Sequence, residues 1–206
     1  MDASIPAALV SRIRGLKSFD PDTTATHAST GAIIWLTGLS GSGKTTIATE
    51  LANALRRERS GVCVLDGDEL RRGVNSDLGF SPEDRTENVR RVAELAKLLA
   101  GEGLIVIAAL ISPFQKDRSN ARAIARTAEV DFIEVYLNCP VDVCEHRDPK
   151  GLYKRARTGS LVAFTGIDSG YEVPQEPEIV LFTGVQSAGE SRAVLLEFLH
   201  DRLTRI

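Results

Sequence analysis

The sequence is short of cysteine and of long apolar runs. Its three cysteines, Cys63, Cys139 and Cys144, are odd in number and form no C-x-x-C pair. This pattern argues against a disulfide framework and favours free thiols in a reducing cytoplasm. No apolar run approaches the roughly 20 residues that a membrane-spanning helix needs. The N-terminal stretch also lacks the basic start and apolar core of a secretory signal, so we expect a cytoplasmic protein.

The chain also lacks a surplus of positive charge. Its 25 lysines and arginines stand against 28 aspartates and glutamates, so the net charge is −3. This balance argues against bulk electrostatic binding to nucleic acid or to an acidic membrane. Residues 1–30 are weakly patterned and indicate an arm or linker, either packed on a neighbouring subunit or disordered. We expect residues 31–206 to form one enzyme domain with a full core.

What the sequence does contain is a phosphate-binding motif. Residues 38–45 read GLSGSGKT, which has the spacing G-x-x-x-x-G-K-[ST]. Glycines allow a tight turn whose amides converge on an anion. The lysine reaches the β- and γ-phosphates, and the final hydroxyl can hold Mg²⁺. We therefore expect Mg-ATP to bind here, through Gly38, Leu39, Ser40, Gly41, Ser42, Gly43, Lys44, Thr45 and Thr46.

The segments on either side of the motif support this interpretation. Residues 32–37, AIIWLT, predict a buried strand, and residues 46–59 carry apolar side chains at helical spacing. Strand, loop and helix N-terminus follow in the order that directs a helix dipole at a phosphate. The alternative is a glycine-rich turn that contains Gly-Lys-Thr by chance, and the correct flanks on both sides argue against it.

A pair of carboxylates follows the second predicted strand. Residues 62–65, VCVL, lead into Asp66, Gly67 and Asp68. The carboxyl end of a parallel strand lies at the rim where α/β sheets bind ligands, although two acids around a glycine are equally typical of a plain turn. Beside a phosphate-binding loop we favour the functional interpretation. Asp68 would be a metal partner or a general base, and Asp66, closer to the strand, would be structural.

A helix is predicted from Ser81 to about residue 100. Ser81 suits the N-cap, a proline follows it, and acids fill the first turn. Two polar residues, Arg85 and Asn88, fall on the apolar face of this helix. One interpretation is that their stems cover the end of the helix. We favour a face that enters a cleft, where Arg85 binds an anion and Asn88 orients it, because arginine grips oxyanions well.

Three more strands are expected, at residues 104–111, 132–137 and 178–182. The repeated order of strand and helix predicts a three-layer α/β sandwich with a parallel five-stranded sheet. The first of these three strands carries no acid, which leaves Asp68 as the obvious metal-binding candidate. This strand ends at Ser112, which is either a turn residue or a substrate contact.

The last third of the chain is predicted to hold a lid and a closing helix. Residues 147–171 combine clustered cations with scattered glycines. This composition favours a lid that closes over the site, although a solvated basic loop would look the same. Residues 188–203 predict an amphipathic helix whose inward side chains are Val194, Leu195, Phe198 and Leu199.

Together the motifs resemble the adenylylsulfate kinase (APS kinase) family of P-loop kinases. The resemblance extends over about residues 31–205. It rests on an ordered set: GLSGSGKT at 38–45, DGDELR at 66–71, LGFS at 78–81 with Arg85 and Asn88, ISP at 111–113, DPKGLYK at 148–154 and FTGID at 164–168. It implies an α/β/α P-loop NTPase fold with a lid. Family members use Mg-ATP to phosphorylate the 3′-hydroxyl of adenosine 5′-phosphosulfate (APS) in sulfate assimilation, giving PAPS and ADP, and are commonly homodimers.

The resemblance also implies roles for single residues. Asp68 would serve the 3′-hydroxyl, directly or with Thr45 as a metal residue through water, and Phe80 and Phe164 would stack on the adenine of APS. Ser112 matches the family's phosphoserine position. A nucleophilic serine needs a neighbouring base, and none of the three histidines lies in its motif, so we expect direct transfer. The implied APS-binding set is Asp68, Arg71, Phe80, Arg85, Asn88, Ile111, Ser112, Lys150, Phe164 and Ile167, with Lys44 catalytic and Arg147 on the ATP side.

The sequence departs from the family pattern at one position, and it leaves two alternative functions open. Gln115 stands where a basic residue often follows Ser-Pro-aromatic, which puts a minor anion contact in doubt. The first alternative is a kinase of the same fold for a nucleoside or a sugar acid. The aromatic positions and the face with Arg85 and Asn88 argue against a sugar acid. The second is a nucleotide-gated regulatory module without turnover. The presence of Lys44, Thr45 and Asp68 argues against it.

Overall fold

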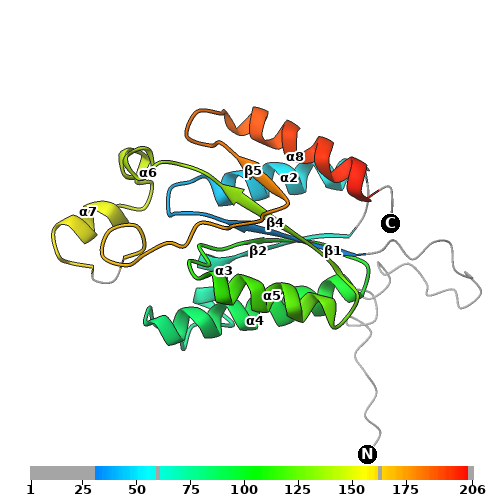
Figure 1. The fold of residues 1–206 in the computed structure, drawn as a ribbon, viewed down its shortest axis with the longest axis horizontal. Helices are drawn as coiled ribbons and strands as arrows, with labels where there is room; N and C mark the ends of the chain where they lie inside the picture. The colour runs from blue at the N-terminus through cyan, green and yellow to red at the C-terminus, as the bar shows by residue number, and fades with distance from the viewer. Residues whose placement is uncertain (1–30, 59–60, 162–163, 204–206) are drawn as a thin grey trace, which may run out of the picture.

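The computed structural model describes residues 31–58, 61–161 and 164–203. Within them, five parallel strands form one sheet in the order β2-β3-β1-β4-β5 (Figure 1). The predicted parallel five-stranded sheet is therefore confirmed. The expected N-terminal arm, residues 1–30, lies outside the described residues. The strands are β1 (Ala32–Thr37), β2 (Val62–Asp66), β3 (Ile105–Ala109), β4 (Asp131–Leu137) and β5 (Ile179–Leu181).

Helices cover both faces of the sheet and complete three layers. Figure 1 shows α2 and α8 on one face and α4 and α5 on the other. No helix in the described part of the chain is long and apolar enough to cross a membrane. The helices are α2 (Lys44–Glu58), α3 (Gly67–Arg72), α4 (Pro82–Gly101), α5 (Gln115–Arg126), α6 (Val141–Arg147), α7 (Leu152–Arg157) and α8 (Ala188–Leu203).

β1 occupies the centre of the sheet because both of its faces are apolar. All six of its residues are buried, and successive side chains point to opposite faces. Ile34 and Leu36 join the core under α2 and α8, whereas Ile33 and Trp35 join the core over α4 and α5. Each such side chain contributes about 1.5–3 kcal/mol through burial. The carboxyl end of β1, and with it Gly38, is thereby held in the middle of the rim.

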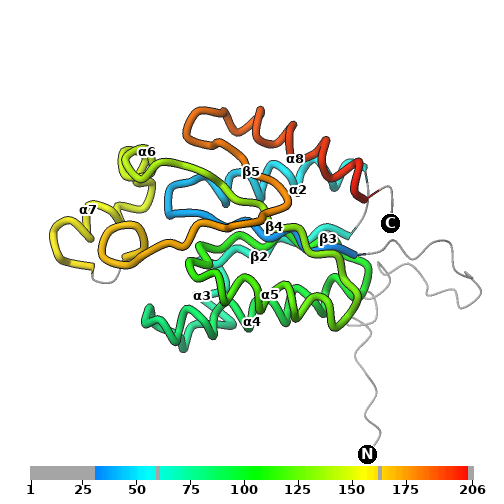
Figure 2. The backbone as a smooth tube through the Cα atoms, viewed as in Figure 1, coloured from blue at the N-terminus to red at the C-terminus, as the bar shows by residue number. Residues whose placement is uncertain are grey.

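A smaller apolar cluster lies beyond this end of the sheet. Figure 2 shows α6, α7 and the segment after α7 grouped to one side of the strands. We call this group of apolar residues the lid cluster, because most of its members come from the predicted lid. Its buried members are Leu39, Cys139, Cys144, Tyr153, Ala156 and Phe164, with Ile167 and Tyr171 packed against them.

Some details differ from the sequence-based predictions. The segment predicted as an irregular lid contains a helical turn, α7, because Tyr153 and Ala156 are buried three residues apart on one face. β3 is shorter than predicted and ends at Ala109, although the amide of Leu110 still donates to the carbonyl oxygen of Leu36 at 3.1 Å. Val194 was predicted to face inward, and this prediction is wrong. Val194 is 40% exposed, because the fully buried face of α8 runs through Ser191, Leu195 and Leu199 at one-turn spacing.

Candidate active site

The phosphate-binding loop follows β1 and is shaped by three glycines with positive φ. Gly38, Gly41 and Gly43 have φ angles of 152°, 77° and 97°, which side chains with a Cβ rarely adopt. A Cβ on Gly41 would lie 2.7 Å from the carbonyl oxygen of Cys144, so the loop packs directly on α6. A Cβ on Gly43 would meet nothing within 4 Å. The loop is therefore tightly supported on one side and open at Gly43.

Lys44 begins α2 and folds back onto the loop. Its Nζ donates to the carbonyl oxygens of Gly38 and Leu39 at 2.9 and 2.7 Å. Burial lowers the pKa of Lys44 to about 8, so part of the population loses its charge above that pH. A bound phosphate would raise this pKa again, because a nearby negative charge favours the ammonium form. Lys44 can therefore exchange its two neutral carbonyl acceptors for a charged phosphate oxygen.

Thr45 contacts Asp66 rather than Asp68. The Thr45 hydroxyl donates to Asp66 Oδ2 at 2.8 Å, and the other oxygen of Asp66 accepts from the amide of Asp68 at 2.9 Å. Asp66 therefore caps α3, in agreement with its predicted structural role, and also lies beside the hydroxyl that was expected to hold Mg²⁺. A hydroxyl and a carboxylate are hard oxygen donors of the kind that Mg²⁺ binds, so the pair fits that ion.

Asp68 instead meets a cation from the lid. Lys150, in the turn between α6 and α7, makes an ion pair with Asp68 Oδ2. The two side chains are about half exposed, at 53% and 49%, so this contact is worth only about 0–1 kcal/mol. Both charges act on the ammonium group of Lys44. Residues 82 positions apart thus converge beside the phosphate-binding loop.

Arg71 and Phe80 form a pair at the rim, next to β2. The Arg71 guanidinium carbon lies 4.5 Å from the centre of the Phe80 ring, and its Nη1 donates to the carbonyl oxygen of Gly79 at 2.8 Å. Desolvation lowers the pKa of Arg71 from its usual value. Phe80 remains 60% exposed. A large exposed aromatic ring beside a cation is well suited to receive a planar anionic ligand.

Arg85, one of the two polar residues on the apolar face of α4, reaches the lid. That this face enters a cleft stays a prediction. Arg85 donates through Nε to the carbonyl oxygen of Phe80 at 2.9 Å, and its Nη1 donates to the hydroxyl of Thr165. Burial, reinforced by the charge of Arg71, lowers the pKa of Arg85. Asn88, three residues further on, is 6% exposed. The helix therefore brings Arg85 next to the lid residue that follows Phe164.

Phe164 and Ile167 belong to the lid cluster. Phe164 is 7% exposed and meets the ring of Tyr153 edge-on, with centroids 4.9 Å apart. Tyr153 also donates from its hydroxyl to the carbonyl oxygen of Ser40 at 3.0 Å. Sequence reasoning gave Tyr153 no role, yet it joins the lid to the phosphate-binding loop. The only sequence signal for Tyr153 is its position between Lys150 and Lys154 in the predicted lid.

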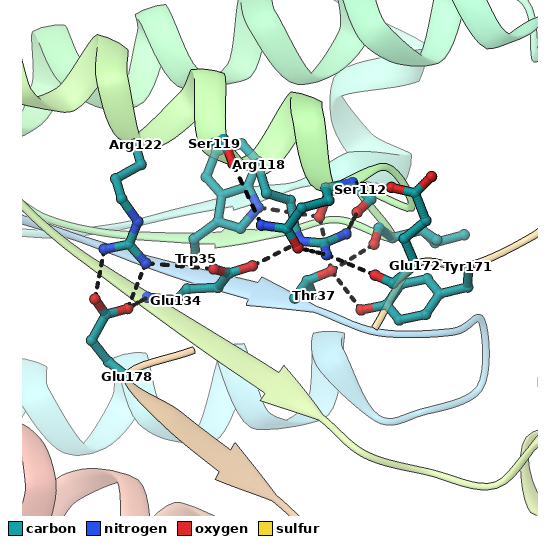
Figure 3. A network of polar contacts seen from close by, with 12 residues as sticks. Trp35, Thr37, Ser112, Arg118, Ser119, Arg122, Glu134, Tyr171, Glu172 and Glu178 are labelled. Carbon is teal, nitrogen blue, oxygen red and sulfur yellow. Dashed lines mark hydrogen bonds and ion pairs between the residues drawn. The ribbon is translucent and has the colours of Figure 1, made fainter. Parts of the chain in front are cut away.

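Ser112 lies behind the rim rather than on it. It is 3% exposed and has a φ of 40°. Its Oγ accepts from Trp35 Nε1 at 3.1 Å and donates to the Thr37 hydroxyl at 3.0 Å, as Figure 3 shows. Thr37 in turn donates to the carbonyl oxygen of Ile111 at 2.8 Å. Among the described residues, the Ser112 hydroxyl bonds to Trp35 and Thr37. Direct transfer without a phosphoserine stays a prediction.

A buried ionic network holds the end of the lid against this rim (Figure 3). Arg118, which is 1% exposed, donates to Glu134 Oε1, to the carbonyl oxygen of Ser112 and to that of Glu172 at 2.7–2.8 Å. The Tyr171 hydroxyl lies 2.9 Å from the Thr37 hydroxyl. Gln115, the residue that departs from the family pattern, accepts from Arg118 at 2.6 Å and so belongs to this network.

Arg147 reaches the phosphate-binding loop from the end of α6. Its Nη2 donates to the carbonyl oxygen of Thr183 at 2.7 Å, and its Nη1 donates to that of Gly41 at 3.4 Å. It therefore lies between the loop and the segment after β5. This position is compatible with the predicted contact to ATP.

Comparisons with known proteins agree with this geometry. Residues 30–182 match the family model described as adenylylsulphate kinase. A probable adenylyl-sulfate kinase of Bacillus subtilis is 53% identical over 173 residues, which are 84% of this chain and 87% of that protein. The adenylyl-sulfate kinase of Bacillus pumilus is 54% identical over 170 residues, 82% of this chain and 85% of that one.

A solved structure gives the same result in three dimensions. The Mycobacterium tuberculosis APS kinase, determined in complex with AMPPNP and APS, is 44% identical and superposes with a TM-score of 0.80. The similarity covers 82% of this chain and 98% of that one. A match over most of both chains at this identity shows the family. The chain belongs to the adenylylsulfate kinase family.

Proposed function

We propose that this chain transfers the γ-phosphate of ATP to the 3′-hydroxyl of APS, giving PAPS and ADP. The observation that carries the proposal is the contact of Asp68 with Lys150 beside Lys44. It brings a candidate base from the end of β2, a lid cation and the phosphate-binding lysine into one place. These are the groups that in-line phosphoryl transfer to a hydroxyl requires: charge neutralisation and an oriented acceptor.

On the donor side, the loop and Lys44 would hold the phosphates of ATP. Amides of the glycine-rich loop would converge on the phosphates, and the N-terminus of α2 adds a favourable dipole. Lys44 would exchange its carbonyl partners for phosphate oxygens. Arg147 would contact the nucleotide near Gly41.

For the metal, we assign Thr45 and Asp66, which lie 2.8 Å apart. Mg²⁺ is usually held by one or two protein oxygens together with substrate phosphates and water. In the described ranges no group of three or more His, Cys, Asp or Glu side chains forms a metal cluster, so this oxygen pair is the best protein contribution. When bound, the ion would supply charge neutralisation at the β- and γ-phosphates. We assign Asp68 to the acceptor instead.

On the acceptor side, Asp68 would orient the 3′-hydroxyl and take its proton. Arg71, Arg85 and Asn88 would hold the phosphosulfate, and Phe80 and Phe164 would contact the adenine. Lys150 would move from Asp68 to the anionic substrate as APS enters, because the exposed ion pair is weak. Ile111 and Ile167 would complete the wall of the site, and Ser112 would support that wall from behind through its bond to Thr37.

We extend the proposal to the organisation of the chain. Residues 31–206 would be the kinase domain, with residues 147–171 as the lid. The protein would act as a cytoplasmic homodimer, and its three free cysteines suit a reducing compartment. Light scattering on the purified protein tests the dimer, whose expected mass is twice 22.3 kDa.

The deciding experiment is an acceptor panel. The purified protein is incubated with Mg-ATP and either APS, a nucleoside or a sugar acid, and ADP and phosphorylated product are quantified. We expect equal amounts of ADP and PAPS with APS and no product with the others. Turnover that occurs only with another acceptor would show that APS is not the substrate. Nucleotide binding without turnover would identify a regulatory module instead.

A further inference from the structure

A short turn between α3 and α4 carries one side chain that neither the motif nor the proposed function uses. Asn75 is 1% exposed, which is unusual for a carboxamide. Its backbone amide donates to the carbonyl oxygen of Leu70 at 2.9 Å, and its own carbonyl oxygen accepts from Leu78 at 3.2 Å. The turn that presents Arg71 and Phe80 is therefore fastened at Asn75.

The side chain of Asn75 makes one hydrogen bond, and that bond goes to a candidate substrate residue. Asn75 Nδ2 donates to Asn88 Oδ1 at 3.0 Å, and both side chains are buried. The Oδ1 atom of Asn75 has no hydrogen-bond partner among the described residues. A buried unsatisfied oxygen is costly, so the pair is not explained by stability alone.

This pairing decides which end of the Asn88 amide is left for a ligand. A carboxamide has one accepting oxygen and one donating nitrogen, which point in different directions. Because Asn75 occupies the oxygen of Asn88, the NH₂ group is directed elsewhere. The reversed arrangement, in which Asn75 accepts from Asn88, would present the Asn88 oxygen instead. Only the first arrangement offers a donor to phosphate or sulfate oxygens.

We propose that Asn75 is a positioning residue for APS: its NH₂ group fixes the Asn88 amide in the orientation that donates to the anionic substrate. This inference deepens the proposed function and rests on it. Asn75 does not itself touch substrate in this scheme. It acts through Asn88, in the same way that an outer hydrogen bond orients a ligand to a metal.

The variant Asn75→Asp tests the orientation because it exchanges the donor for a second acceptor at constant size. When ionised, the new carboxylate would draw in the Asn88 NH₂ and turn its oxygen toward the substrate. We expect the KM for APS to rise about 10- to 100-fold, the range for losing a hydrogen bond to a charged group, while the KM for ATP changes less than about twofold.

The pH dependence separates positioning from a simple packing role. A protonated carboxyl can donate to Asn88 Oδ1 as asparagine does, and burial raises the pKa of such a group. The ratio of variant to wild-type KM for APS should therefore fall as the pH is lowered from about 9 to about 6. The matched control Asn75→Leu keeps the volume without a donor, so its raised KM for APS should not depend on pH in this way. Nucleotide binding and the melting temperature show whether each variant is folded.

The outcomes are distinct. Wild-type protein that does not turn over APS overturns the proposed function and this inference together. An active wild type with an unchanged KM for APS in both variants overturns the inference alone. An equal rise of the KM for both substrates, or the same pH-independent effect in Asn75→Asp and Asn75→Leu, also overturns it. If Asn75→Asp does not fold, an unchanged KM for APS in Asn75→Leu is sufficient to overturn it.

Discussion

The phosphate-binding loop and the lid meet at one site but are held there in different ways. The loop is shaped by backbone conformation: three glycines with positive φ, a close approach to α6 and a central strand buried on both faces. The body of the lid is attached by side chains, among them the half-exposed Lys150 and the hydroxyl of Tyr153. Among the described lid residues, Tyr153 and Phe164 are buried in the lid cluster, and at the trailing end Tyr171 and the adjacent Glu172 join the buried ionic network.

We infer from this difference that the loop and the lid have separate roles in catalysis. A backbone loop is already in place before the substrate arrives and cannot distinguish acceptors. Exposed side-chain contacts are weak enough to exchange for contacts with a substrate. Substitutions in the loop should therefore impair every phosphoryl transfer, whereas substitutions in the lid should act on APS.

The largest expected effect is at Asp68, where the two regions meet. Asp68→Asn keeps the size of the side chain and removes its charge and basicity. We expect kcat to fall about 10²- to 10⁴-fold, the usual contribution of a positioned general base, with ATP binding retained. Steady-state kinetics at saturating ATP and APS measure the effect.

Asp66→Asn is the matched control for Asp68, because the structure puts Asp66 beside Thr45. Its loss should raise the Mg²⁺ concentration needed for half-maximal rate, and excess Mg²⁺ should restore much of kcat. Excess Mg²⁺ should not restore the kcat of Asp68→Asn. If excess Mg²⁺ rescues Asp68→Asn instead, Asp68 is a metal residue and the assignment of the base is wrong.

The next effect tests the loop. Lys44→Ala removes the charge that would offset the transferring phosphoryl group, and we expect a loss of about 3 kcal/mol in transition-state stabilisation, as for one preorganised donor. The loss should be the same for every acceptor that the enzyme accepts. Lys116→Ala, an exposed position on α5, is the control that removes a lysine charge elsewhere. A kcat near that of the wild type in Lys44→Ala would contradict the assignment of the loop.

A smaller and more selective effect is expected in the lid. Phe164 is packed against Tyr153, so Phe164→Ala would disturb the lid cluster as well as any stacking. Phe164→Leu keeps most of the volume and removes the ring. We expect it to raise the KM for APS by the equivalent of about 1–3 kcal/mol, the range for stacking a base on an aromatic ring, and to leave the KM for ATP nearly unchanged.

Phe80→Leu provides the comparison, because Phe80 is 60% exposed and contributes little to packing. Similar APS-specific losses in both variants would support two aromatic contacts with the adenine. An equal rise in both KM values for Phe164→Leu would make Phe164 part of the scaffold.

The smallest effect on turnover is expected at Ser112. Ser112→Ala leaves the indole N–H of Trp35 without its acceptor, at a cost of about 1–3 kcal/mol in the free energy of unfolding, but it removes no group from the reacting atoms. Activity should remain measurable while the unfolding midpoint drops. Ser112→Gly, which suits the φ of 40°, controls for backbone strain. Complete loss of activity together with a phosphoserine formed at a competent rate in the wild type would favour a covalent route.

The sequence predicted the loop side of the site better than the lid side. Residues 38–45 and β1 are local: one segment holds the motif, the strand and the helix, so composition and periodicity suffice. Asp66 was harder to assign, because two acids two residues apart look alike in a sequence. Only the helix cap turns Asp66 to Thr45 and leaves Asp68 facing Lys150.

The lid and the inner supports of the site depend on contacts between distant segments. Asn75 meets Asn88 across 13 residues and Arg85 meets Thr165 across 80. Neither pairing has a periodic signature. Ser112 was placed at the rim from its position after β3, yet its positive φ and the acceptance of the Trp35 N–H turn its hydroxyl inward. A strand end locates a residue, but it does not determine the direction of its side chain.

Trp35 gives the molecule a built-in optical probe. It is the single tryptophan of the chain, it is fully buried, and its indole N–H bonds to Ser112, whose hydroxyl chain leads through Thr37 to Tyr171 at the end of the lid. Its fluorescence is therefore a one-residue signal from the interior of the sheet. Emission should be shifted to short wavelength in the native state, and any rearrangement of the lid that disturbs Tyr171 should be readable from it without a label.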